Sequence, residues 1–78
     1  MEKKLLNSTI KFSLACLGKL EEKESNGWGG WDWEACKTSF EKRIKHDAKS
    51  KLTQKSLVNI ANYCMFLWNL IENKREVT

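Results

Sequence analysis

The segment from residue 57 to residue 71 constrains the fold more than any other part of this chain. Only Asn59, Asn62 and Asn69 interrupt its otherwise apolar residues. A helix that is apolar on almost every side is typical of the centre of a protein. Proline, which breaks helices, is absent from all 78 residues. We therefore expect an all-α fold in which a helix over about residues 53–73 is the central element.

Two further helices are predicted before this one. Over residues 2–23, apolar side chains recur every three or four positions, as in an amphipathic helix. Over residues 33–49 the apolar stripe is narrower, which is typical of a surface helix. We expect Asp32 to cap this second helix and Trp33 to point inward beside Phe40. Residues 24–32 are then a loop rich in glycine and tryptophan, and Ser50 or Thr53 caps the third helix.

The length of the chain bears on its assembly. A single domain of 78 residues (1–78) buries a marginal core, and two flanking helices cannot cover a helix that is apolar all round. The uncovered surface predicts a homodimer that forms a helical bundle, or a protein partner. The three cysteines, Cys16, Cys36 and Cys64, are odd in number and widely spaced, as expected of free thiols in the cytoplasm. No apolar run is long enough to cross a membrane, so no membrane partner is expected.

Tryptophan is concentrated in one place. Three of the four tryptophans lie within residues 28–33, beside two glycines. Loops often carry binding residues, and tryptophan contributes strongly to interfaces. We expect Trp28, which has glycine on both sides, to contact a partner. Trp31 is either a second contact or a hydrophobic staple on the following helix.

A strip of lysines lies on one side of the second predicted helix. Lys42, Lys45 and Lys49 share this side, and the net charge of the chain is +4. Such a strip can follow the phosphates of a nucleic acid, although a charged strip is usually a solvated helix face. Together with Trp28 and Trp31, these lysines are the predicted partner-binding residues.

The asparagines of the third predicted helix lie on one side of it. At about 100° per residue, Asn59, Asn62 and Asn69 share a stripe with Phe66 in its middle. An aromatic ring between amides suits a small-ligand pocket or an oligomer seam. The alternative is that these positions simply face solvent.

Catalytic chemistry has little support in the sequence. His46 is the only histidine, and it lies among charged residues with no nucleophile beside it. The glycines of residues 27–30 do not form a phosphate-binding loop, because no Gly-Lys-Ser/Thr follows them. The acidic residues do not form opposed pairs on two helices. We expect no catalytic residue, no bound metal and no cofactor.

One segment resembles a known enzyme family. Residues 59–65 read Asn-Ile-Ala-Asn-Tyr-Cys-Met, which resembles the Asp-Val-Ala-Asn-Tyr/Phe-Ala-Met signature of MazG-like all-α nucleotide pyrophosphohydrolases. Gly29-Gly30-Trp31 is similar to a segment before a helix in small phage and archaeal members. The resemblance implies dimeric assembly and Mg²⁺ held by two acidic pairs. Only one of those four acids has a counterpart in this chain, Asp47, whose partner position is Ile44 or Ser50. The second pair falls on Ser56 and Asn59, which are not acidic.

The sequence thus predicts a non-catalytic small helical binding protein. Together with the resemblance, the small size indicates a protein of the kind that phages and mobile elements encode to inhibit or regulate a host defence protein. One alternative is a MazG-like pyrophosphohydrolase or nucleotide-binding protein with Mg²⁺. Its pocket would contain five residues: Asp47, Asn59, Asn62, Phe66 and Asn69. A second alternative is a nucleic-acid-binding module, whose affinity would fall steeply with salt.

Overall fold

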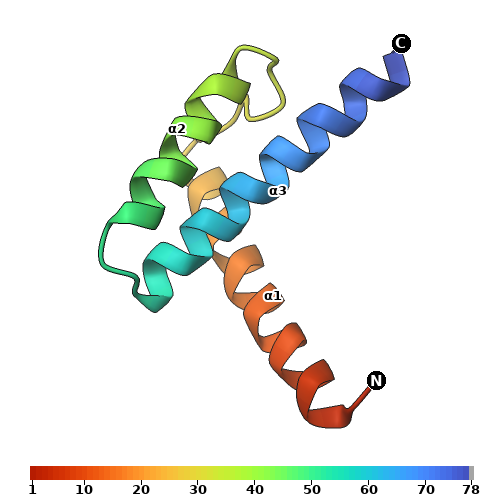
Figure 1. Cartoon of the computed structure of the whole chain (residues 1–78), viewed down its shortest axis with the longest axis vertical. Coiled ribbons are helices and arrows are strands. Elements are labelled where there is room, and N and C mark those ends of the chain that lie inside the picture. The colour runs from red at the N-terminus through yellow and green to blue at the C-terminus, as the bar shows by residue number, and fades with distance from the viewer. Residues whose placement is uncertain (78) are drawn as a thin grey trace.

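The fold consists of three helices. The computed structural model describes the backbone of residues 1–77 and the side chains of residues 1–72. In chain order the helices are α1 (Lys3–Ser25), α2 (Cys36–Lys49) and α3 (Gln54–Val77), as Figure 1 shows. Residues 1–77 contain no strand. The predicted all-α architecture with three helices is therefore confirmed.

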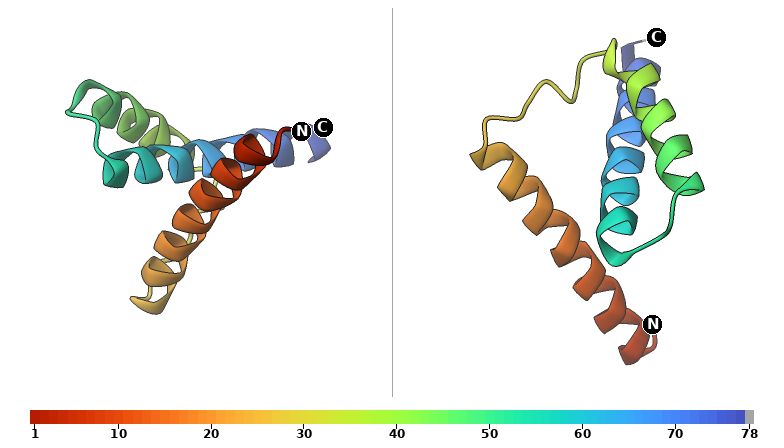
Figure 2. Two further views of the ribbon diagram at one scale, coloured as in Figure 1. Left: turned by 90° about the horizontal axis from the view of Figure 1, so that it is seen from below. Right: turned by 90° about the vertical axis from the view of Figure 1, so that its left-hand side faces the viewer.

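The helices are arranged around α3. α2 lies alongside α3, and the short link of residues 50–53 joins them (Figure 1). α1 crosses α3 at a steep angle, and its N-terminal end projects beyond the first turn of α3 (Figures 1 and 2). α3 packs against both other helices, so its predicted central place is confirmed.

The start of α2 differs from the prediction. The helix begins at Cys36 rather than at residue 33, and no side chain caps it. Tight turns occupy residues 31–35, where the Trp33 N–H donates to the Gly30 carbonyl at 3.3 Å. Gly30 has a φ of +74°, a left-handed conformation that glycine adopts without strain. Because these turns precede the helix, the expectation that Asp32 caps it is wrong.

The start of α3 has a reciprocal cap. The Thr53 N–H donates to the Ser56 Oγ at 2.8 Å, and the Ser56 N–H donates to the Thr53 Oγ1 at 3.1 Å. Each side chain thus pairs a backbone donor that the helix itself leaves free. Thr53, one of the two residues expected to cap this helix, does so.

The core is a cluster of aromatic rings centred on α3. Phe66 is only 2% exposed, and its ring centroid lies 5.2 Å from that of Phe40. The rings of Trp28 and Trp31 reach Phe66 from the loop between α1 and α2, with centroids at 5.3 and 5.4 Å. Tyr63 completes this aromatic cluster at 6.2 Å from Phe66. Offset and tilted rings at such distances attract one another beyond the area that they bury.

Trp33 does not belong to the core. It is 69% exposed, so the expectation that it points inward beside Phe40 is wrong. Residue 33 lies in the turns before α2 and does not follow the helical periodicity on which the expectation rested. Trp31 packs against the core instead, and Trp28 packs on Phe66 at the exposed edge of the cluster.

Candidate interaction surfaces

One side of α1 carries a row of exposed aliphatic residues. All of α1 lies among the described residues, and none of its 23 residues is buried. The four residues of the row are between 44% and 61% exposed. We call this row the α1 outer face, and it consists of Leu6, Ile10, Leu14 and Leu17.

The opposite side of α1 contacts α3. Cys16 and Leu20 are half-buried there, and Leu20 packs against the core. The Nδ2 of Asn62, a buried residue of α3, donates a hydrogen bond to the Cys16 carbonyl at 3.2 Å. Because successive residues turn by about 100°, the α1 outer face points away from α3. It therefore has no cover within the described chain.

A second apolar row runs along α3, opposite the aromatic cluster. Its members are spaced alternately four and three residues apart, and no charged residue occurs anywhere from 57 to 71. Trp68 is the most exposed of them, at 63%. This spacing is the heptad pattern of a helix that packs against another helix. We call the row the α3 outer face, and it consists of Leu57, Ala61, Cys64, Trp68 and Ile71.

An apolar hollow adjoins the first turns of α3, where α1 crosses it. Its volume is about 440 Å³. Phe12 and Ala15 of α1 line one side, and Leu57 and Val58 of α3 line the other. The α3 outer face therefore continues at Leu57 into a hollow between two helices.

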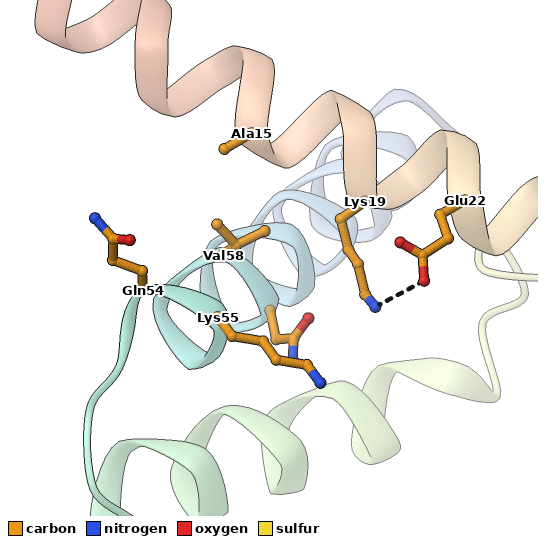
Figure 3. Close-up of a pocket in the computed structure, with 7 residues that line it drawn as sticks. Ala15, Lys19, Glu22, Gln54, Lys55 and Val58 are labelled. Atoms are coloured by element: carbon orange, nitrogen blue, oxygen red, sulfur yellow. Dashed lines mark ion pairs between the residues drawn. The ribbon is translucent and has the colours of Figure 1, made fainter.

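A second hollow, of about 420 Å³, lies on the other side of Val58 and is more polar (Figure 3). Lys19 forms an ion pair there with Glu22 at 3.5 Å. The Asn59 Oδ1 is buried beside this hollow and has no hydrogen-bond partner among the described residues. An unpaired buried amide oxygen is a local cost to stability.

The five residues predicted for a nucleotide pocket or an oligomer seam do not line a common hollow in the described chain. Asn62 and Phe66 are buried in the interior, and the Asn69 Nδ2 donates to the Met65 carbonyl of its own helix at 2.9 Å. Within the described chain, Asn59 is the one member of the predicted set that lines either hollow, and Asp47 lies half-buried on α2. Asn62 and Phe66 face inward, because α1 and the loop tryptophans cover them.

The predicted contact residues fall into two groups. Trp31 is half-buried in the aromatic cluster, whereas Trp28 packs on Phe66 but remains 36% exposed. The Lys23 ammonium lies 5.0 Å from the centroid of the Trp28 ring. The lysine strip is exposed on α2, at Lys42, Lys45 and Lys49. Sequence reasoning did not single out Trp68, although the heptad spacing around it was the available signal.

The cysteines differ in environment. Cys64 is exposed on the α3 outer face, whereas burial raises the pKa of the Cys16 thiol. Cys36 is half-buried, and its thiol donates to the Gly30 carbonyl at 3.3 Å. Among the described residues, no three histidine, cysteine or acidic side chains are grouped so as to hold a metal ion. Within the part of the chain that the structure describes, no helix has the length and hydrophobicity that a membrane span requires.

Comparison with known proteins yields no relative. No protein-family model matches the chain, and no curated protein or solved structure is significantly similar to it. Its function must be inferred from its own surfaces.

Proposed function

We propose that this chain is a small helical binding protein that docks the α1 outer face onto an apolar surface of a partner protein. The observation that carries the proposal is a helix of 23 residues with no buried residue and with a continuous aliphatic row on one side. Exposed apolar rows of this kind mark interaction sites on soluble proteins.

The spacing of the row suits one mode of recognition. Leu6, Ile10, Leu14 and Leu17 follow one another by four, four and three residues, so they project from one side of the helix. Amphipathic helices present anchors at such intervals to a hydrophobic groove or to another helix. Because α1 is already helical, binding does not have to order it, and less of the interaction energy is lost.

The charges beside the row indicate the rim of the partner's groove. Lys4 and Lys11 lie on the polar side of α1, and both are exposed. Charges at the rim of an interface steer the encounter and select partners of opposite sign. We therefore propose an apolar groove with acidic residues at its edge.

The more specific form of the proposal concerns the partner's identity. We propose that the partner is a host protein, such as a defence protein, and that a phage or mobile element uses this chain to inhibit or regulate it. The support is the small size of the chain, its uncovered apolar surface and the resemblance of residues 59–65 to a family with small phage members.

The experiment compares two variants that each add one positive charge to α1. Leu14→Lys interrupts the α1 outer face, whereas Ser8→Lys changes the opposite side of the helix. Both positions are exposed, so circular dichroism should show intact helices in both variants. A partner captured by the wild type should be lost from Leu14→Lys and kept by Ser8→Lys, and calorimetry with the purified partner should give the same order. Equal binding by the two variants contradicts the proposal.

A direct assay distinguishes the proposal from the enzymatic alternative. The chain is incubated with nucleoside triphosphates and Mg²⁺, and released pyrophosphate is measured. We expect no release above the rate without protein. Turnover that disappears in Asp47→Ala would replace the binding-protein proposal with a MazG-like activity. Affinity for nucleic acid that falls steeply with salt, and weakens in Lys45→Ala, would favour the nucleic-acid alternative.

A further inference from the structure

We propose that two copies of this chain pair through the α3 outer face in antiparallel orientation. In this dimer Trp68 of each copy enters the hollow between α1 and α3 of the other copy. The surface concerned is distinct from the α1 outer face, so the inference does not rest on the proposed function.

The exposed area of the chain is the first support. Its accessible surface is 6346 Å², and its mass is 9.1 kDa. A compact monomer of that mass exposes only about 4,900 Å², which leaves a surplus of about 1,400 Å². A stable interface removes about 800 Å² from each partner. The surplus is therefore large enough for a dimer interface with area left over.

The chemistry of the α3 outer face is the second support. Its five residues repeat at heptad spacing, and no residue from 57 to 71 is charged, so pairing along this row itself buries no unpaired ion. A symmetric dimer requires a surface that matches itself. An uncharged helical seam meets this requirement, because a second copy presents the same apolar row.

The sizes of the seam residues select the orientation. A parallel pair would place Trp68 against Trp68 and Ala61 against Ala61, which overfills one layer and leaves a void in another. An antiparallel pair places Ala61 beside Cys64 of the second copy at its centre. These two small side chains let the helices approach closely, and Trp68 then lies beside Leu57 of the second copy.

The hollow beside Leu57 gives Trp68 a place to bind. It measures about 440 Å³; Phe12, Ala15 and Val58 supply an apolar lining beside Leu57, and Ser8, Lys11 and Gln54 complete the rim. Tryptophan is one of the residues enriched among the side chains that fill pockets and contribute most to binding at protein interfaces. Trp68 is 63% exposed in the single chain, so dimerisation covers a large side chain that the fold leaves in water.

The first experiment is sedimentation velocity over a range of micromolar concentrations, with two matched variants. Trp68→Lys and Trp33→Lys each replace an exposed tryptophan, 63% and 69% exposed respectively, so neither change removes a core residue. We expect the wild type and Trp33→Lys to dimerise. Trp68→Lys should raise the dimer dissociation constant about 30-fold or more, as the loss of an interface anchor does. A wild type that stays monomeric throughout, or variants that behave alike, would overturn the proposal.

The second experiment uses the cysteine at the centre of the seam. Cys64 is exposed, whereas Cys16 and Cys36 are half-buried, so a short thiol-reactive crosslinker should join two chains through Cys64. The covalent dimer should disappear in Cys64→Ser, and its persistence would place the interface elsewhere. In Ala61→Cys, mild oxidation should link the thiol introduced at position 61 to Cys64 of the second copy. A disulfide between the two copies of position 61 would exclude the antiparallel arrangement.

Discussion

The aromatic cluster and α1 use apolar residues in opposite ways. Around Phe66, which is 2% exposed, rings from the loop, α2 and α3 pack on one another. Along α1, Leu14 is 61% exposed, and no residue of the helix is buried. The difference shows that burial is concentrated in one part of the molecule and exposed apolar surface in another. The cluster holds α2, α3 and the loop together, and the uncovered side of α1 is the surface on which the proposed partner docks.

This division follows from what each part contacts. α3 shares its buried side with two neighbours, whereas α1 meets α3 along one side only. Burial of a large aliphatic or aromatic side chain contributes about 1.5–3 kcal/mol, so residues that stay exposed forgo that stabilisation until a partner covers them. The following substitutions test the contrast between the two parts, from the largest expected effect to the smallest.

Phe66→Ala should break the cluster and with it the fold. Removing a buried phenylalanine ring costs about 3–5 kcal/mol, a large share of the stability of a chain this short. We expect urea unfolding followed by circular dichroism to show a largely unfolded variant at room temperature. Trp33→Ala removes a larger but exposed ring and should leave the unfolding midpoint almost unchanged. Similar losses in the two variants would refute the central place of Phe66.

Asn62→Ala should weaken the packing of α1 on α3 and leave the aromatic cluster folded. The variant lacks the hydrogen bond to the Cys16 carbonyl and some buried packing, a loss of about 1–2 kcal/mol. Hydrogen exchange should accelerate in α1 more than in α3. Asn69→Ala is the control, because among the described residues the Asn69 amide bonds to Met65 of its own helix. Equal acceleration of exchange in all three helices would show that this hydrogen bond does not stabilise the docking of α1 in particular.

Asn59→Leu should act in the opposite direction and stabilise the fold. The Asn59 Oδ1 is buried without a partner, so an apolar side chain of similar size removes a desolvation cost worth about 1 kcal/mol. The urea midpoint should rise. Asn7→Leu, at an exposed position on α1, should not raise it by a comparable amount. A lower midpoint in Asn59→Leu would mean that the amide is paired in solution.

Lys23→Gln should have the smallest effect. The Lys23 ammonium lies 5.0 Å from the Trp28 ring centroid and 5.9 Å from that of Tyr63, which ties the end of α1 to the cluster. Loss of these cation–π contacts costs about 0.5–1 kcal/mol. Thermal unfolding should show a slightly lower midpoint for Lys23→Gln, and Lys23→Arg should restore it. A failure of arginine to restore stability would assign the effect to packing rather than to charge.

The number and order of the helices were predictable from hydrophobic periodicity, and so was the central place of α3. Hydrophobic periodicity did not predict which side of α3 faces the interior. Periodicity identifies the residues that share a side of a helix, but a helix that is apolar all round gives no preference between its sides. The stripe with Asn62 and Phe66 faces the interior, and the stripe with Trp68 faces out.

The loop was harder still to predict. Residues 28, 31 and 33 are all tryptophan, but of these three only Trp28 and Trp31 contact Phe66. Their directions depend on the turns at Gly27 and Gly30, where φ is +84° and +74°. Backbone turns of this kind have no period, so side-chain spacing carries no information about which ring points inward. The candidate contact surfaces that the structure adds, the outer faces of α1 and α3, therefore lie outside this loop.

The loop tryptophans also govern the order in which the molecule can assemble during synthesis. α2 and α3 are neighbours in the sequence and can pair as soon as both are made. Trp28 and Trp31 precede α2, but the ring on which they close, Phe66, is far along α3. α1 is thus made before α2 and α3, and the loop that follows it cannot close on the core until Phe66 has been made.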